Sequence, residues 1–199
     1  MDKNYEKGIE LLENNDIENA KKYFLNSVKS GEKRALYYLR KIRNKQNIDS
    51  KRKKEYSYKI IQSNLGYKVY IPDSFKFLDT INDKCFDTIT IEKDDNFDLY
   101  NLKTQGFLIE IPNDCLELIS IDSIINHMPN ISEVMDYESE NTIGKIVKTK
   151  PIYGIVSYTL ITKGYKGIYQ FKISVDEFLE NEYVNVIYKI LNSFECIDK

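Results

Sequence analysis

The hydrophobic pattern changes its period once along this chain, and that change constrains the fold more than any other feature. Residues 3–47 contain no proline, and their apolar residues recur at the spacing of amphipathic helices. After residue 56 the apolar residues alternate with polar ones at a period of two, which is typical of half-buried strands. The pattern therefore predicts an all-helical segment followed by a part rich in strands.

Three short helices are expected in the first part. The first carries Tyr5, Ile9 and Leu12 on one face. The stripes of the other two consist of Ile17, Ala20, Phe24 and Val28, and of Ala35, Leu36, Leu39 and Ile42. Asp16 is a good N-cap for the second helix, and Gly31 suits the left-handed residue that ends it.

The second part is expected to form an antiparallel sheet with helices beside it. The alternating segments contain Tyr67, Val69 and Ile71; Ile89 and Ile91; Phe107, Ile109 and Ile111; and Tyr169, Phe171, Ile173 and Val175. Gly164 and Gly167 mark a hairpin before the last of these strands. Helices are predicted over roughly 121–128 and around 183–194, where Tyr183, Ile187, Ile190 and Phe194 share a face. The predicted fold class is α+β, with one packed and one solvated face on the sheet.

A basic run from Arg40 to Lys54, with Asp49 as its only acidic residue, separates the two parts. We predict a helical domain over residues 1–48, a basic linker over 49–56 and an α+β domain over 57–199. The run is expected to be a solvated helix end and linker. Weak nucleic-acid binding through this linker is an alternative, but the formal net charge of −2 opposes close approach to a polyanion, so nucleic acid is an unfavoured partner.

The helical part resembles a tetratricopeptide repeat. Gly8, Ala20 and Phe24 stand at the relative spacing of that family's small-residue, alanine and phenylalanine positions, and Gly31 and Ala35 match its short Gly-x-x-x-Ala variant. The likeness covers one repeat and the first helix of another, and the proline that usually ends a repeat is absent. Stacked repeats need about three units to bury a continuous core, so this segment is expected to pack on another surface.

The second part resembles the PsbP-like family. Residues 66–75, Gly-Tyr-Lys-Val-Tyr-Ile-Pro-Asp-Ser-Phe, are similar to that family's opening strand and turn, and the helix ending in Ile190-Leu-Asn-Ser-Phe194 is similar to its C-terminal signature. Members of the family serve as photosystem assembly subunits, as a Ran-binding nucleotide-release factor and as bacterial domains of unknown role. The resemblance implies binding and supplies no catalytic residues. A cystatin-like or other sheet-plus-helix fold is the alternative.

No motif for catalysis or for a cofactor is found. His127 is the only histidine, and its helical position places it opposite Ile121, Ile124 and Ile125, on a face expected to be wet. The chain contains no Gly-x-Ser-x-Gly, His-Glu-x-x-His or Cys-x-x-Cys sequence and no phosphate-binding glycine loop. We therefore predict no catalytic, cofactor-binding or metal-binding residues. An enzyme with a dispersed site of Tyr, Asp and Lys remains the alternative.

Acidic residues and cysteines are further candidate site residues. Asp94, Asn96 and Asp98 have calcium-loop spacing, but Leu99 replaces the turn-forming Gly and Gln105 the bidentate Glu, so a loop is predicted. The remaining acidic candidates, expected to be surface charges, are Asp136, Glu138, Glu140, Glu177 and Glu180. The cysteines, expected to be buried free thiols of a protein in a reducing compartment, are Cys85, Cys115 and Cys196.

The function predicted from these features is a non-enzymatic interaction or assembly protein. Its partner is expected to contact the helical stripe through Tyr5, Ile9, Leu12 and Leu36, together with the exposed face of the sheet. A homo-oligomer formed through the N-terminal helices is a second form of the same prediction. Because no apolar signal region or membrane-length apolar run occurs, a cytoplasmic location without membrane association is expected.

Overall fold

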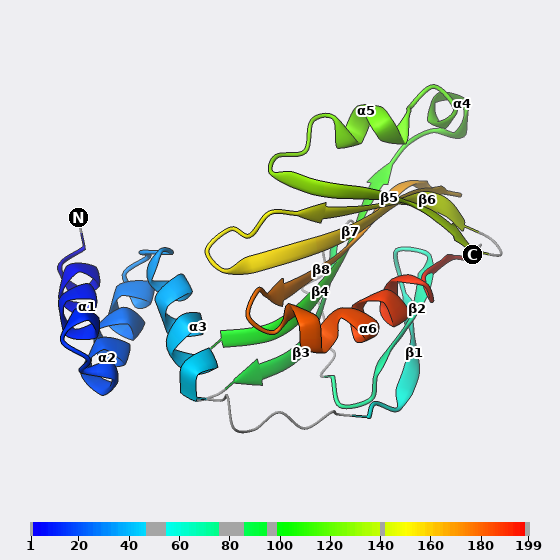
Figure 1. Ribbon diagram of the computed structural model, residues 1–199. Coiled ribbons are helices and arrows are strands. Elements are labelled where there is room, and N and C mark those ends of the chain that lie inside the picture. The colour runs from blue at the N-terminus through cyan, green and yellow to red at the C-terminus, as the bar shows by residue number, and fades with distance from the viewer. Residues whose placement is uncertain (1, 47–54, 76–85, 95–98, 140–141, 198–199) are drawn as a thin grey trace.

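The structure, a computed structural model, describes residues 2–46, 55–75, 86–94, 99–139 and 142–197 (Figure 1). Three helices come first: α1 (Lys3–Glu13), α2 (Ile17–Lys29) and α3 (Ala35–Gln46). They form a helical unit at one end of the molecule, and the rest is an α+β unit of antiparallel sheets and flanking helices (Figure 1). The predicted fold class is confirmed.

The larger sheet has six strands in the order β3-β4-β8-β7-β6-β5, and every neighbouring pair is antiparallel. Its strands are β3 (Phe86–Asp94), β4 (Leu99–Glu110), β5 (Ile131–Ser139), β6 (Thr142–Thr149), β7 (Ile155–Gly164) and β8 (Gly167–Asp176). The smaller sheet, in the order β1-β2-β9, contains β1 (Tyr58–Ser63), β2 (Tyr67–Pro72) and β9 (Glu195–Cys196). The hairpin predicted at Gly164 and Gly167 joins β7 to β8.

One face of the six-stranded sheet is closed by a core. Helix α6 (Glu180–Leu191) and strand β2 lie over this face, and the predicted residues of β2, β8 and α6 meet there. Tyr67 stacks on Phe194 with ring centroids 5.1 Å apart, and Ile187 and Ile173 are fully buried. The Tyr137 hydroxyl donates to the carbonyls of Leu191 and Phe194, which fixes the end of α6. We call this surface the helix face of the sheet.

Strand β4 corrects the prediction of one packed and one solvated face. Leu102 and Leu108 point to the helix face and are buried, whereas Phe107 and Ile109, which were expected to be packed, lie on the opposite face. Ile109 is 47% exposed. Apolar side chains therefore point to both faces of this strand, so the second face of the sheet is partly apolar.

The ends and contacts of the N-terminal helices follow their sequence signals. Asp16 caps α2 by accepting a hydrogen bond from the Asn19 amide at 3.3 Å, and Gly31 has the left-handed φ of 95°. Gly8 lies directly against the Phe24 ring, which allows α1 and α2 to pack closely. The buried centre of the helical unit also includes Leu99 of β4, so this unit shares a core with the sheet.

The basic run was predicted to be solvated, and this is wrong for two of its arginines. Arg40 and Arg43 of α3 are only 6% and 2% exposed, and both face the fully buried Asp176 at the end of β8. Arg43 Nη2 donates to Asp176 Oδ2 at 2.5 Å, and Arg43 Nη1 donates to Asn101 Oδ1 at 2.6 Å. Arg40 Nη1 donates to the Tyr153 carbonyl. Residues 47–54 of the run lie outside the described ranges.

Asp176 therefore anchors the helical unit to the sheet. Arg40 Nε lies 3.1 Å from the same carboxylate oxygen without the alignment of a hydrogen bond, and Asp176 Oδ1 accepts from the Phe178 amide at 2.9 Å. Burial raises the pKa of Asp176, and the two guanidinium charges oppose that rise. A carboxylate buried at this depth is tolerated because cations and amides surround it.

Replacing Asp176 by asparagine tests this anchor. Asp176→Asn keeps the size of the side chain but leaves two guanidinium groups buried without a counter-charge, so we expect a loss of about 3–5 kcal/mol in the free energy of unfolding. Urea denaturation measures the loss, and hydrogen exchange of the α3 amides reports whether the helical unit has separated. The control is Asp136→Asn, whose carboxylate is 92% exposed. Equal unfolding midpoints for the two variants would contradict the anchoring role.

Gly8→Ala tests the contact between α1 and α2. A Cβ at this position would lie 2.7 Å from a ring carbon of Phe24. Overpacking costs about 1–3 kcal/mol, which exceeds the gain of about 1 kcal/mol that alanine gives a helix over glycine. Thermal denaturation should show a lower midpoint, and the loss should shrink in a Phe24→Leu background. A higher midpoint for Gly8→Ala would show that the ring moves aside freely.

Candidate functional site

A half-open groove of about 650 Å³ lies on the face of the six-stranded sheet opposite α6. We call it the sheet groove. Its apolar lining comes from Phe107, Ile109, Met128, Pro129, Ile152 and Ile155. Its polar lining comes from Thr149, Ser157, Thr159, Gln170 and Lys172. This volume is in the range of ligand-binding pockets, which are about 300–1,000 Å³.

Two segments of the chain border the groove. On one side, α4 (Asn113–Leu116) and α5 (Ile121–Ile125) cover part of the same sheet face, where Ile125 packs on Val147 and Ile161. The chain after α5 then brings Met128 to the groove. On the other side, the turn before β7 supplies Ile152, and the next residues of this turn contact Arg40 and Tyr37 of α3. The sheet groove thus lies between the α4–α5 segment and the attached helical unit.

The floor of the groove is polar because short hydroxyl and amide side chains alternate outward from β6, β7 and β8. Thr149 Oγ1 accepts a hydrogen bond from the Ser157 amide at 3.3 Å, and the hydroxyls of Ser157 and Ser174 lie 3.2 Å apart. Thr159 is directly opposite Lys172 in the register of β7 and β8. A ligand that lies on this floor would meet both donors and acceptors.

Lys172 in the lining and Lys103 beside it give the groove its charge. Lys172 lines the groove from β8, and Lys103 of β4 points to the same face, two residue pairs away in the register. Burial lowers the pKa of Lys103, and the charge of Lys172 lowers it further. Within the described parts of the chain, neither ammonium group has an ion-pair partner, whereas Lys145 and Lys148 pair with Asp122 and Glu180. The sheet groove is therefore electropositive.

A second polar cluster lies on the helix face and has a structural role. The Tyr158 hydroxyl donates to Glu180 Oε1, and Lys148 Nζ lies 2.6 Å from the same oxygen. Burial, together with the bond to Glu180, raises the pKa of Tyr158 to about 12, so the phenol stays protonated. Burial acts to raise the pKa of Glu180, but the bonds from Lys148 and Tyr158 lower it overall. These contacts tie the start of α6 to the sheet.

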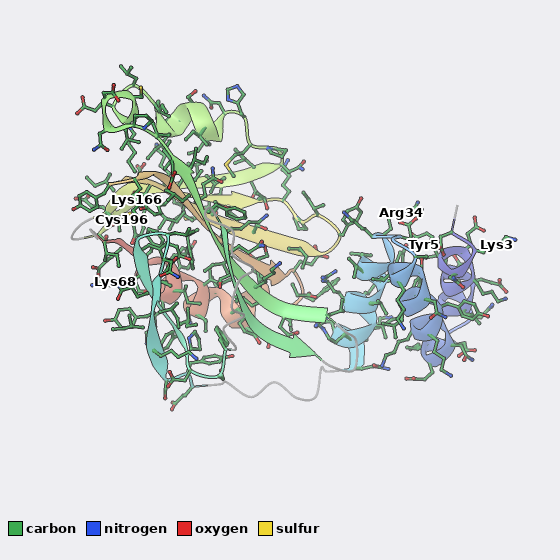
Figure 2. All side chains as sticks on the ribbon, turned by 180° about the vertical axis from the view of Figure 1, so that it is seen from behind. Lys3, Tyr5, Arg34, Lys68, Lys166 and Cys196 are labelled. Atoms are coloured by element: carbon green, nitrogen blue, oxygen red, sulfur yellow. The ribbon has the colours of Figure 1, made fainter. Side chains whose placement is uncertain are left out.

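The predicted partner-binding residues lie inside the helical unit. Tyr5, Ile9, Leu12 and Leu36 are each half-buried and pack against its core. Tyr5 meets the Phe24 ring edge-on with centroids 6.2 Å apart, and the Arg34 guanidinium lies over the Tyr5 ring, 4.6 Å from its centroid. Figure 2 shows Tyr5 and Arg34 together in this unit, at the end of the molecule away from Cys196. Their contact with a partner stays a prediction.

The sheet groove itself was only partly visible in the sequence. The exposed sheet face was expected to bind, but Lys103, Phe107, Ile109 and Lys172 were not predicted as its binding residues. Lys103 stands at the same phase as Phe107 and Ile109 on its strand, and this mixed phase is the signal that was available. The pairing of β4 with β8, which brings the four side chains together, follows from tertiary structure alone.

The other candidate residues that the structure describes do not come together as a site. His127 is exposed as predicted, and its Nδ1 lies 2.7 Å from the Ser123 carbonyl. Among the residues that the structure describes, no group of three or more His, Cys, Asp or Glu side chains is arranged to hold a metal ion. Asn96 and Asp98 of the calcium-like segment lie outside the described ranges, as does Glu140. None of the described helices combines the length and apolar character needed to cross a membrane.

The prediction that the cysteines are buried is wrong for Cys115, which is exposed in α4. Cys196 is partly buried in β9 beside Gly164, and Cys85 lies outside the described ranges. Burial raises the pKa of the Cys196 thiol to about 12. Since the thiolate is the reactive form, the Cys196 thiol is weakly nucleophilic at neutral pH.

Comparison with known proteins supports the fold. No family model and no curated protein matches the sequence. The solution structure of cyanobacterial PsbP (CyanoP) from Synechocystis sp. PCC 6803 is similar to this structure with a TM-score of 0.53 at 12% sequence identity, over 72% of this chain and 94% of that one. At that identity the likeness shows a PsbP-like fold and nothing about activity.

A second solved structure, from Bacteroides thetaiotaomicron VPI-5482, matches 67% of this chain and 46% of its own at 10% identity with a TM-score of 0.40. That similarity is too low to carry an argument. The tetratricopeptide resemblance of the helical unit has no counterpart in these comparisons and stays a resemblance.

The two described thiols should differ in reactivity. In a Cys85→Ser variant at pH 8, we expect the exposed Cys115 to react with Ellman's reagent within the mixing time and Cys196 to react only in denaturant, because its thiol remains protonated. A Cys115→Ser exchange in the same background provides the control, which should show no rapid phase. Rapid modification of Cys196 in the folded protein would contradict its assigned burial.

Proposed function

We propose that this protein is a non-enzymatic interaction module whose sheet groove receives a segment of a protein partner. The observation that carries the proposal is the groove itself: an apolar rim around a polar floor on a face that α6 leaves uncovered. Ile109 and Ile152 on its rim are 47% and 45% exposed. Exposed apolar side chains that gather around one groove mark interaction surfaces more often than isolated ones do.

The chemistry of the lining supports binding over catalysis. Lys172 is the only titratable side chain among the residues that line the described groove. An acid and a base, or a nucleophile and its base, would have to converge within hydrogen-bond distance for an enzymatic reaction. The enzyme alternative therefore gains no support here, and the PsbP-like resemblance likewise implies binding.

The helical unit extends the proposal. Through α3 it borders one end of the groove, so a partner seated in the groove lies close to this unit. Contact through Tyr5, Ile9, Leu12 and Leu36, self-association through the N-terminal helices and a cytoplasmic location remain predictions. Nucleic-acid binding loses two of its cations, because Arg40 and Arg43 are held by Asp176.

Ile109→Arg tests the groove as the docking site. An arginine on the rim would place a charge where the partner's apolar side chains are expected, so partner recovery should fall about tenfold or more. The measurement is quantitative mass spectrometry of partners cross-linked to the tagged protein in extract of its native cell. Ile143→Arg is the matched control, because Ile143 is 73% exposed and is not part of the groove lining. Equal recovery with both variants would show that the partner docks elsewhere.

A further inference from the structure

The positive charge of the sheet groove indicates the charge of the molecule that binds there. Lys103 and Lys172 lie at diagonal positions of β4 and β8, on one face, without an acidic partner in the described chain. Like charges held close together and partly away from water disfavour one another. An anion placed between them would relieve this repulsion, so the groove favours an occupant that carries negative charge.

The junction beside the groove adds no net positive charge. Arg40 and Arg43 bring two guanidinium groups to the carboxylate of Asp176. The charge of the neighbouring Glu177 also acts on Arg40, so two carboxylates balance the two guanidinium groups. The attraction for an anion in the groove therefore comes from the lysines of the strands.

The lining also indicates an extended peptide. A bound chain exposes amides and carbonyls that need hydrogen-bond partners, and the hydroxyls of Thr159 and Ser157 and the amide of Gln170 supply donors and acceptors along the floor. Phe107, Ile109 and Ile155 provide apolar contacts on the rim. An alkyl chain would satisfy the rim but would leave the polar floor unpaired.

We propose that the sheet groove binds an extended protein segment in which one or two Asp or Glu residues are flanked by apolar residues. The carboxylates lie between Lys103 and Lys172, and the apolar side chains lie against Phe107, Ile109 and Ile155. This inference rests on the proposed function and names the chemistry of the partner.

A random heptapeptide library displayed on phage and selected against the full chain tests the inference. We expect the selected sequences to be enriched in Asp or Glu next to Leu, Ile or Phe. Synthetic copies of the best peptides are then measured by fluorescence anisotropy. Exchange of their acids for Asn or Gln should weaken binding about tenfold or more, and 500 mM salt should weaken it relative to 50 mM.

Variants of the protein test whether Lys103 and Lys172 attract the acidic residues of the peptide. Lys172→Met and Lys103→Met keep the aliphatic stem and remove the cation, so each should weaken binding of the selected peptides about tenfold. Lys29→Met, at an exposed position at the end of α2, should leave binding unchanged. If a methionine variant does not fold, Lys172→Gln replaces it. Lys172→Glu should recover binding to peptides whose acids are changed to lysine.

The outcomes separate this inference from the proposed function. One outcome is that the peptides bind Ile109→Arg more weakly, show no preference for acidic residues and bind Lys172→Met as well as the unaltered protein. This outcome would support the groove as the docking site and overturn its acidic specificity. Peptides that bind Ile109→Arg as well as the unaltered protein, or a selection that yields no groove-dependent peptide, overturn the proposed function. Displacement of a weakly held peptide by dodecanoate at micromolar concentration would identify a small amphiphile as the occupant and overturn the inference.

Discussion

The buried contact of Asp176 with Arg40 and Arg43 is the interaction on which the arrangement of this molecule depends. It joins the end of β8 to α3, two elements far apart in sequence, and places the helical unit beside one sheet face. A buried ion pair contributes little net stability compared with apolar packing, but loss of one partner is costly. Such a contact therefore selects one orientation of the two units, and this orientation gives the sheet groove one of its sides.

The two faces of the six-stranded sheet have different roles for a physical reason. On the helix face, α6 and β2 cover a continuous apolar core, and the polar groups at its border are paired, as Tyr158 and Lys148 are with Glu180. On the opposite face, α4 and α5 cover only the part around Val147 and Ile161. What remains there combines exposed apolar side chains with lysines that have no partner in the described chain. This contrast separates a structural surface from a binding surface.

Features with local causes were predicted well from sequence. The N-cap at Asp16, the left-handed Gly31, the hairpin at Gly164 and Gly167 and the apolar stripe of α6 all depend on neighbouring residues, and the structure contains each of them. Features that depend on distant partners were not. The burial of Arg43 requires Asp176, which lies far along the chain, and no local pattern distinguishes a paired arginine from a solvated one. The exposure of Cys115 and the faces to which the side chains of β4 point also depend on distant partners, so they were not predicted either.

By itself, the sequence determined the succession of helices and strands, the α+β class and the absence of familiar catalytic motifs. These properties follow from hydrophobic periodicity and turn chemistry, which act over a few residues. Only the tertiary structure decided that the helical unit packs on the sheet and that a groove lined by Ile109 and Lys172 forms beside it. The reason is that strand order and buried ion pairs join residues whose separation in sequence carries no signal of their contact.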